Sequence, residues 1–419
     1  MFFAIIDQVE RSFDMDKTIC ELFAGVGGFR LGFERLNTEW NTVWFSQWEP
    51  KAATQWAHEC YVQHFGESED INGNITTGKD IAEVDKNTIP NHSLLVGGFP
   101  CQDYSVAHGL ATEKGIQGKK GVLWWQIYET ITTKRPAFCL FENVDRLLKS
   151  PSKQRGRDFG IMLTCLNELG YSVEWRVVNA AIYGAAQRRR RVFIFAYRND
   201  TVFAHNERNF FPVDVVSREG FFARTFPITP VTKVNSTSVA ADAVTASDEF
   251  KFDFCNAGFM SNGIINTASV SEIEEAPINL GQILESNVDE KFYITDERME
   301  KWVYLKGSKK IPRVADNGHE YIYSEGPVAF PDAWDKPGRT MLTSESTLNR
   351  STHVVEDPGT RRLRLITPME AERLQGFDDN WTNTGMTQRM RYFCMGNALV
   401  VPMVTRMGRT LDDIISQEP

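Results

Sequence analysis

Short apolar runs alternate with amphipathic stretches from about residue 17 to residue 198. Apolar runs that end in polar, Gly or Pro turns are typical of strands, and they occupy 17–25, 41–49, 93–100, 137–144 and 190–197. Stretches with helical spacing lie between them, at 28–36, 52–65, 122–134 and 160–170. This alternation predicts an α/β domain with a mainly parallel sheet. Ligands bind at the carboxyl ends of strands in such sheets, so we expect the chemistry in the turns that follow them.

The pattern changes after residue 198. Between about 199 and 360 the periodicity weakens, and Asn, Ser, Thr, Asp, Pro and Gly interrupt short segments. The amphipathic pattern returns in 367–377 and 396–415. Two domains also suit a chain of 419 residues. We therefore predict that residues 1–198 and 385–419 form the α/β domain and that 199–384 form a smaller, irregular domain.

The composition is that of an ordinary globular protein, with 42% hydrophobic and 24% charged residues. No apolar run approaches the roughly 18 residues that a membrane helix needs. The opening MFFAII lacks a basic region and makes a poor signal peptide. The seven cysteines include no CxxC pair, which argues against both a zinc cluster and a disulfide framework. We expect a soluble, cytoplasmic protein with no metal and no membrane partner.

The net charge of −9 is opposite in sign to the basic footprint of most nucleic-acid-binding proteins. Screening limits the reach of each charge to about 8–10 Å, so the local balance matters more than the sum. Basic residues cluster in three places: 188–191; Lys309, Lys310 and Arg313; and Arg339, Arg350, Arg361, Arg362 and Arg364. Charge alone therefore neither supports nor excludes binding to DNA.

A glycine-rich turn, 23–28, follows the first predicted strand and precedes a helix. Glycines at such a turn let a ligand approach the backbone and the helix N-terminus. The third glycine of a dinucleotide fingerprint would fall at Arg30, which disfavours a nicotinamide enzyme. A similar near-match to a phosphate-binding loop, 73–80, has Asp80 where a Ser or Thr would hold magnesium, which disfavours a nucleoside triphosphatase.

Three further turns carry reactive side chains. Cys101 follows the strand at 93–96 on a Gly/Pro turn, where a thiol would face substrate, although a lone cysteine is more often a packing residue. Glu142 closes the next strand and would face the same edge, unless its turn only caps a helix. Gln187 and four arginines, 188–191, precede the last strand of the domain.

Seven motifs in this chain order resemble those of the DNA (cytosine-5) methyltransferase family, in its bacterial or phage restriction–modification type. They are FAGVGG at 23–28, GKDI at 78–81, GGFPCQ at 97–102, ENV at 142–144, QRRRR at 187–191, RLITPMEAERLQGF at 364–377 and GNALVVP at 396–402. The resemblance implies a Rossmann-like, S-adenosylmethionine-dependent methyltransferase domain and a target-recognition domain in the middle region. It also implies double-stranded DNA as the partner and a monomer as the working form.

The resemblance also implies the roles of individual residues. For S-adenosylmethionine they are Phe23, Gly25, Val26, Gly27, Glu49, Asp80, Ile81, Pro100, Leu123 and Asn397. Glu49 departs from the family pattern because Trp48 precedes it and Pro50 follows it. The catalytic set is Cys101 as nucleophile, Glu142 on the target cytosine, and Arg189 and Arg191 near the base and its sugar-phosphate. Candidate DNA contacts are Gln102, Ser105, Arg339, Thr340, Asn349 and Arg350.

These residue types suit cytosine methylation. A thiolate added to C6 places electron density on C5, and a carboxyl group at N3 stabilises the charge that develops. An arginine beside the thiol would lower its pKa. A base inside a duplex cannot reach such a cleft, so the cytosine must flip out. The residues from 105 to 121 suit a loop that closes over it, or an ordinary solvated loop.

Two alternatives remain open at this point. One is a tRNA cytosine-5 methyltransferase on the same scaffold, and the other is a catalytically inactive DNA-binding module. The long middle region favours DNA over tRNA, and the intact set of Cys101, Glu142, Arg189 and Arg191 argues against an inactive module. We also expect that replacing Arg350 would weaken or relax site choice without harming cofactor binding.

Overall fold

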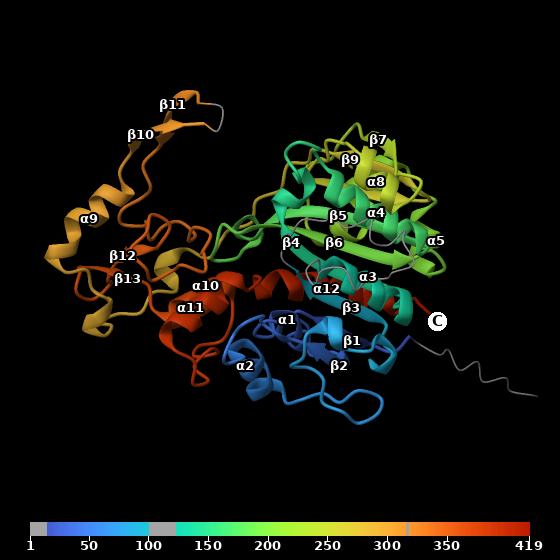
Figure 1. Ribbon diagram of the computed structural model, residues 1–419, viewed down its shortest axis with the longest axis horizontal. Coiled ribbons are helices and arrows are strands. Elements are labelled where there is room, and N and C mark those ends of the chain that lie inside the picture. The colour runs from blue at the N-terminus through green and yellow to red at the C-terminus, as the bar shows by residue number, and fades with distance from the viewer. Residues whose placement is uncertain (1–14, 100–122, 316–317) are drawn as a thin grey trace, which may run out of the picture.

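The computed structural model describes residues 15–99, 123–315 and 318–419. The chain forms a larger lobe around a nine-stranded sheet and a smaller lobe that carries two short two-stranded sheets (Figure 1). Residues 100–122, which include the predicted Pro100, Cys101, Gln102 and Ser105, lie outside the described residues.

The large sheet has the strand order β2-β1-β3-β4-β6-β5-β8-β9-β7. Its strands are β1 (Thr18–Leu22), β2 (Asn41–Ser46), β3 (Leu94–Gly98), β4 (Phe138–Val144), β5 (Tyr171–Asn179), β6 (Arg190–Arg198), β7 (Asn235–Ser238), β8 (Ala257–Ser261) and β9 (Ile264–Ala268). The strands from β2 to β4 are parallel, and every pairing from β4–β6 onward is antiparallel. The α/β fold class is confirmed, with a mixed sheet that is parallel in the half bearing the predicted motifs.

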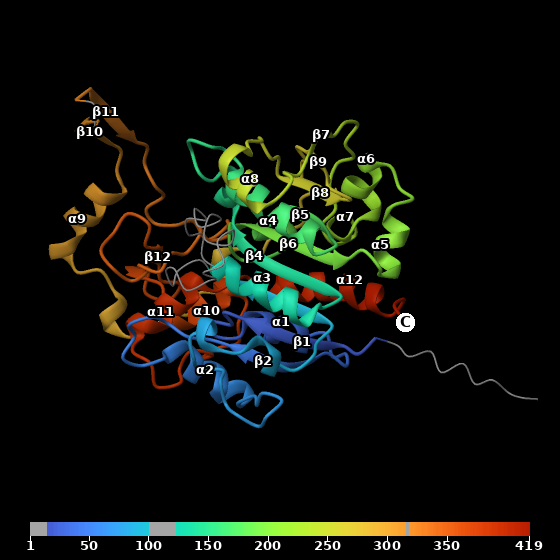
Figure 2. The same ribbon diagram turned by 45° about the vertical axis from the view of Figure 1, so that its right-hand side comes forward.

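Helices cover both faces of this sheet (Figure 2). One face packs on α1 (Gly28–Glu34), α7 (Phe221–Thr225) and α12 (Val401–Ile415), and the other on α3 (Leu123–Lys134), α4 (Arg157–Glu168) and α8 (Ala243–Glu249). The remaining helices of this lobe are α2 (Trp56–Phe65), α5 (Val202–Glu207) and α6 (Pro212–Asp214). Each fully buried Leu, Ile or Phe contributes roughly 1.5–3 kcal/mol, so two apolar layers hold the sheet rigid and position the loops at its edge.

The smaller lobe contains α9 (Asp296–Lys306), a ribbon of β10 (Lys309–Val314) and β11 (Glu320–Glu325), and a second pair of β12 (Val354–Glu356) and β13 (Leu363–Leu365). Two helices, α10 (Pro368–Gln375) and α11 (Gln388–Asn397), join it to the larger lobe. The start of α10 is set locally: Pro368 occupies the first turn, and Thr367 and Glu370 form a reciprocal capping box.

The predicted second domain, 199–384, differs from the structure in its first part. Strand β8 pairs with β5, and β9 and β7 follow it, so residues 235–268 extend the large sheet. The turn between β8 and β9 is Asn262-Gly263, with both residues at positive φ, a common hairpin turn. These strands are only four or five residues long, so their periodicity was too short to stand out. Their burial comes from pairing with a strand that is distant in sequence.

None of the helices in the described ranges combines the length and the apolar character that crossing a membrane requires. Within the same ranges, no group of three or more His, Cys, Asp or Glu side chains is arranged to hold a metal ion.

Candidate active site

The predicted motifs meet at one edge of the large sheet. Register places the ends of neighbouring parallel strands together: Leu22 of β1 pairs with Ser46 of β2 and lies next to Gly97 of β3, and Gly98 pairs with Glu142 of β4. Strand β6 runs the other way, so its first residues reach the same edge. The carboxyl ends of these four strands and the start of β6 therefore lie at one edge of the sheet, beside α10 and α11.

Glu142 and Arg191 form an ion pair at this edge, with 2.7 Å between Glu142 Oε1 and Arg191 Nε. The antiparallel pairing of β4 with β6 places Arg191 opposite Val144, next to Glu142. Both side chains are largely buried, with 12% of Glu142 and 18% of Arg191 exposed, so the pair is only weakly screened by solvent. Because Gly98 is the partner of Glu142 in the sheet, the carboxylate lies beside the strand end that leads, three residues later, to Cys101.

Arg189 is buried and links three segments. Its guanidinium donates hydrogen bonds to the backbone oxygens of Met341, at 3.2 Å, and Gly396, at 3.1 Å. Burial, reinforced by the nearby charge of Arg191, lowers the pKa of Arg189 to about 9, and Glu142 opposes this shift. The two predicted arginines thus have different partners. Arg191 forms an ion pair with the Glu142 carboxylate, and Arg189 links this edge of the sheet to the smaller lobe and to the segment before α12.

Asn143 is a functional residue that the sequence analysis did not single out. Its buried side chain donates from Nδ2 to the backbone oxygen of Phe99 at 2.8 Å, and its Oδ1 accepts from the Val144 N–H at 2.8 Å. The only sequence signal was its place inside the ENV motif. Asn143 therefore positions the last described residue before Pro100 and Cys101.

The glycine-rich turn after β1 has the backbone that its sequence predicts. Phe23, Gly25 and Gly27 have φ of 55°, 58° and 86°, in the left-handed region that glycine adopts most readily. A Cβ placed on Gly25 would meet no atom within 4 Å, so open space lies over this residue. A Cβ on Gly27 would come within 2.4 Å of the Phe65 ring, so Gly27 is required for packing and Gly25 faces a space that a ligand can occupy.

Two side chains hold this turn, and the sequence analysis predicted neither. Gln47, the first residue after β2, accepts from the Gly25 N–H at 2.7 Å. Trp381 donates from Nε1 to the backbone oxygen of Val26 at 2.8 Å, and its ring stacks on His64 at 3.6 Å between centroids. Because Gln47 directly follows a parallel strand, its position in the sequence could have predicted a role at this edge. The sequence around Trp381 contains no pattern that predicts its contact with Val26.

The other predicted cofactor residues are gathered around the same edge. Ile81 is buried in the apolar cluster against which Phe23 and Leu123 also pack. The Asp80 carboxylate accepts from the Ala82 N–H and caps a short 3₁₀ helix, Ile81–Glu83. Glu49 is half-buried, and burial raises the pKa of its carboxyl.

Asn397 is exposed at the end of α11. Glu49 lies close enough to Cys394 of the same helix to raise the pKa of that thiol, after the larger effect of burial. This edge of the sheet thus carries an apolar cluster with Phe23, Ile81 and Leu123, and Glu49 lies near helix α11, which ends at Asn397.

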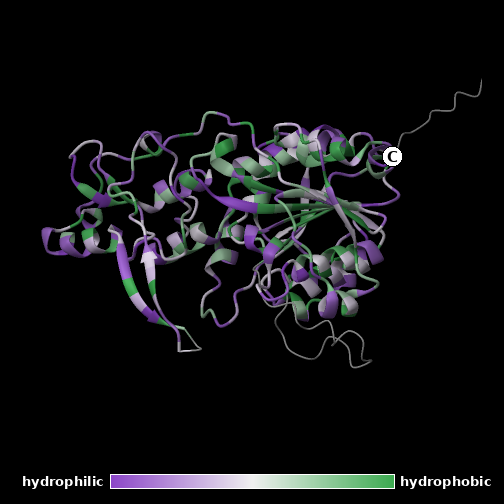
Figure 3. Ribbon diagram, turned by 90° about the horizontal axis from the view of Figure 1, so that it is seen from above, coloured by the Kyte–Doolittle hydropathy of each residue, from purple (hydrophilic) through white to green (hydrophobic). Residues whose placement is uncertain are grey.

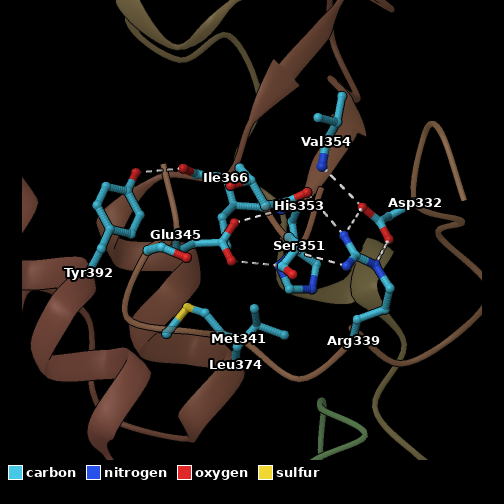
Figure 4. Close-up of polar contacts among 12 residues, drawn as sticks. Asp332, Arg339, Met341, Glu345, Ser351, His353, Val354, Ile366, Leu374 and Tyr392 are labelled. Carbon is cyan, nitrogen blue, oxygen red and sulfur yellow. Dashed lines mark hydrogen bonds and ion pairs between the residues drawn. The ribbon is translucent and has the colours of Figure 1, made fainter. Parts of the chain in front are cut away.

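Two of the predicted DNA contacts, Arg339 and Arg350, have partners inside the smaller lobe. Arg339 forms a two-pronged ion pair with Asp332, at 2.6 and 3.0 Å, and donates to the Ser351 and Thr352 carbonyls (Figure 4). Arg350 donates to the carbonyls of Leu305, Gly307 and Gly326 and pairs with Glu325 at 3.6 Å. Backbone carbonyls in loops need hydrogen-bond donors, and the five N–H groups of a guanidinium supply them. The guanidinium groups of Arg339 and Arg350 are therefore hydrogen-bonded to loop carbonyls inside the lobe.

The other two predicted contacts also have internal partners. Thr340 donates from Oγ1 to the Arg188 carbonyl at 2.6 Å, which fastens the smaller lobe to the arginine segment. Asn349 accepts from the N–H groups of Ser351 and Thr352, and its Nδ2 donates to the Ser344 carbonyl. Thr340 lies at the site edge, whereas Asn349 shapes a turn in the smaller lobe.

Comparisons with known proteins identify the family of this chain. The family described as C-5 cytosine-specific DNA methylase matches residues 17–413. The chain is 52% identical over 405 residues to the Type II methyltransferase M.Sau3AI of Staphylococcus aureus, covering 95% of this chain and 96% of that protein. It is 27% identical to the Type II methyltransferase M.SsoII of Shigella sonnei, covering 93% of this chain and 79% of that one.

Solved structures share the fold at low identity. A mutant of Spodoptera frugiperda DNMT2 matches with a TM-score of 0.58 at 15% identity, covering 94% of this chain and 99% of that one. The Dnmt2 methyltransferase of S. pombe matches with a TM-score of 0.57 at 14% identity, covering 94% and 98%. From the family match, the identity to M.Sau3AI and the site at the sheet edge, the chain belongs to the C-5 cytosine-specific DNA methylases and is a DNA (cytosine-5-)-methyltransferase of the restriction–modification type.

Proposed function

We propose that the protein transfers a methyl group from S-adenosylmethionine to C5 of a cytosine flipped out of a short, specific duplex DNA site, through a covalent bond between Cys101 and C6. The observation that carries this proposal is the Glu142–Arg191 ion pair at the end of β4, directly beside the strand that leads to Cys101. The carboxyl group, with a cation to orient it, lies beside Gly98 of β3, three residues before Cys101 in the sequence.

In the proposed reaction the Cys101 thiolate adds to C6 of the target cytosine. The displaced electron pair moves to C5, and Glu142 stabilises this change by contacting N3 and the exocyclic amine. C5 would then take the methyl group as its bond to the donor sulfonium breaks and leaves a neutral thioether. A solvent base takes the C5 proton, and the electron pair of that C–H bond re-forms the 5,6 double bond and expels the Cys101 thiolate. Arg191 holds the Glu142 carboxylate in place throughout.

The residues at the sheet edge suit S-adenosylmethionine, which supplies an electrophilic methyl group when bound. The open space over Gly25 admits a ligand next to the backbone, and Phe23, Ile81 and Leu123 provide an apolar surface for an adenine ring. The Glu49 carboxylate suits ribose hydroxyls, and Asp80 suits the adenine edge. The remaining proposed contacts are Val26, Gly27, Pro100 and Asn397.

A duplex DNA substrate fits the two-lobed architecture. Flipping a base out of a duplex costs a few kcal/mol, so the enzyme needs contacts to the DNA outside the catalytic edge. The smaller lobe is fastened directly beside that edge by Thr340 and Arg189 and is suited to supply such contacts. The similarity to proteins named Type II methyltransferases favours a short specific site.

Bisulfite sequencing of plasmid DNA tests this proposal, using a methylation-free host that expresses the wild type, Cys101→Ala or Glu142→Gln. We expect protected cytosines in one recurrent short context with the wild type and none with Cys101→Ala. We expect Glu142→Gln to slow methyl transfer by about 10²–10⁴-fold. A folded wild type that protects no cytosine in DNA but methylates purified tRNA would overturn the proposed substrate, and protection by Cys101→Ala would overturn the proposed nucleophile.

A further inference from the structure

We propose that the β10–β11 ribbon is a DNA-backbone arm, in which Lys309, Lys310 and Arg313 contact phosphates of the duplex. This inference rests on the proposed DNA substrate and goes beyond it, because it assigns a binding surface outside the catalytic edge. The ribbon projects away from the helices of the smaller lobe (Figures 1 and 3).

The smaller lobe has a second basic cluster, formed by the arginines between residues 339 and 364, and its charges are paired inside the protein. All five of its arginines have acidic partners inside the protein. The pairs are Arg339 with Asp332, Arg350 with Glu325, Arg361 with Glu356, Arg362 with Glu290, and Arg364 with both Asp357 and Glu370. A cation that a buried or half-buried carboxylate already neutralises offers little to a phosphate, so Arg339, Arg350 and Arg364 are committed inside the lobe. The pairs of Arg361 and Arg362 are exposed and weaker.

The ribbon cations differ in this respect. Within the described residues, Lys309, Lys310 and Arg313 have no carboxylate within ion-pair distance, and β10 itself contains no acidic residue. Glu325 lies across the ribbon from Lys309 in the register, but its carboxylate pairs with Arg350. Lys310 and Arg313 are exposed, and Lys309 is half-buried. Three positive charges are thus available on one short strand of a protein whose net charge is −9.

Aromatic rings hold two of these cations in place. Lys309 Nζ lies 4.5 Å from the centroid of the Tyr304 ring, and the Arg313 guanidinium lies 3.9 Å from that of Tyr323. Tyr323 faces Ile311 in the register, so Arg313 reaches it diagonally across the ribbon. Stacking of this kind restricts the side chains without neutralising their charge. The cations are therefore ordered and still available to an anion.

The base of the ribbon is clamped to the lobe. Arg350 donates to the backbone oxygens of Gly307, just before β10, and Gly326, just after β11. Lys306, at the end of α9, donates in turn to the Arg350 carbonyl at 3.0 Å. An isolated two-stranded ribbon is only marginally stable in water, so this clamp is what gives the arm a fixed direction. Arg350, which the sequence analysis predicted to contact DNA, thus supports the β10–β11 ribbon that we propose contacts DNA.

Duplex DNA is the polyanion that fits this arm. Alternation along β10 places Lys309 and Arg313 on one face of the ribbon and Lys310 on the other. The major groove of a duplex admits a two-stranded ribbon between its two phosphate backbones, so cations on both faces of the ribbon can reach phosphates. Phosphate contacts carry no base information, so the arm adds affinity and leaves site choice unchanged. The face that bears Lys310 also exposes Val314 and Ile322, each 65% accessible, and a second copy of the chain is the alternative occupant that the experiment must separate.

The test compares the wild type with the triple variant Lys309→Gln, Lys310→Gln, Arg313→Gln. A matched control, Lys233→Gln, Lys251→Gln, Arg409→Gln, removes the same charge from exposed positions of the larger lobe. Binding to a long duplex that contains the methylated site is measured across a salt series. We expect the ribbon variant to lose about 10- to 100-fold in affinity near 0.1 M salt, and the slope of log K against log salt to fall by roughly 2–3.

The control is expected to bind as the wild type does, and the ribbon variant to methylate the same sites and melt at the same temperature as the wild type. An unchanged affinity and slope in the ribbon variant would overturn the assignment of the arm. Loss of self-association without loss of DNA binding would overturn it in favour of a second copy of the chain. A wild type that binds no duplex DNA would refute the proposed substrate itself, which separates that failure from a failure of the arm.

Discussion

Asn143 donates a hydrogen bond from Nδ2 to the backbone oxygen of Phe99 across 2.8 Å, and so ties the end of β4 to the end of β3. The two residues are 44 positions apart in the chain. Phe99 is followed by Pro100 and Cys101, and Asn143 follows Glu142. One buried hydrogen bond thus couples the carboxylate strand to the chain that leads to the proposed nucleophile.

We predict that Asn143→Ala lowers kcat by about 10- to 100-fold with a much smaller effect on KM, because misplacement of a reacting group by an ångström can reduce the rate about 100-fold. Leaving the Phe99 oxygen without a partner should also cost about 1–3 kcal/mol of stability. Asn209→Ala is a matched control, since Asn209 makes the same kind of bond to the His205 carbonyl on the surface. Single-turnover kinetics check this, and a loss of stability with an unchanged kcat would reduce Asn143 to a purely structural role.

We predict that Trp381→Phe weakens S-adenosylmethionine binding by about 5- to 10-fold. The substitution keeps an aromatic ring against His64 but removes the N–H that holds Val26, and a typical hydrogen bond contributes about 1 kcal/mol. Trp334→Phe is the control, because it removes an equivalent bond to the Glu356 carbonyl in the smaller lobe. Isothermal titration of the cofactor into each variant is the measurement. Equal affinities for the two variants would show that Trp381 does not position the turn.

We predict that Glu21 makes the folded protein less stable as the pH rises from about 5 to about 8. Glu21 is fully buried beneath the glycine-rich turn, and burial raises its pKa to about 8, although the Tyr61 hydroxyl opposes this with a hydrogen bond at 3.0 Å. Because the folded pKa exceeds the unfolded value of about 4.3, the stabilising contribution of the neutral carboxyl is complete below that value and is lost as the pH approaches 8.

Glu21→Gln cannot ionise, so the wild type should lose more stability than this variant over that pH range. The exposed Glu34→Gln serves as the control and should follow the wild type. Thermal melts at a series of pH values give the comparison. Parallel curves for wild type and Glu21→Gln would mean that Glu21 does not titrate in this range.

We predict that Arg364→Met destabilises the protein by about 3–5 kcal/mol, because it leaves two buried carboxylates without their cation. Arg364 lies 2.8 Å from Asp357 and 2.7 Å from Glu370, and all three side chains are inaccessible to solvent. Arg362→Met, at the residue before β13, removes a surface ion pair with Glu290 and a stacking contact with the Tyr293 ring, and should cost only about 1–2 kcal/mol. Chemical denaturation of both variants decides the matter, and similar losses would contradict the prediction.

Much of the fold was predictable from local patterns. All five predicted strands and all four predicted helices of the 17–198 region are present, because their apolar runs are long and each ends at a Gly, Pro or polar turn. Strand β5 was not predicted, and β7, β8 and β9 fell in the region taken for a second domain. The Asn262-Gly263 turn could have predicted the hairpin of β8 and β9. The strand with which β8 pairs, β5, is 80 or more residues away in the sequence.

The sequence by itself determined the family motifs and so predicts which residues bear the chemistry, since motif order and the position of each turn after a strand are properties of the local chain. Only the tertiary structure decided how those side chains are held and which charges remain free. Trp381 reaches Val26 across 355 positions, and Arg350 and Arg313 look alike in the sequence although one is bonded internally and the other is exposed. The physical reason is that a hydrogen bond or an ion pair depends on the partner that folding brings within about 3 Å, and no local pattern records that partner.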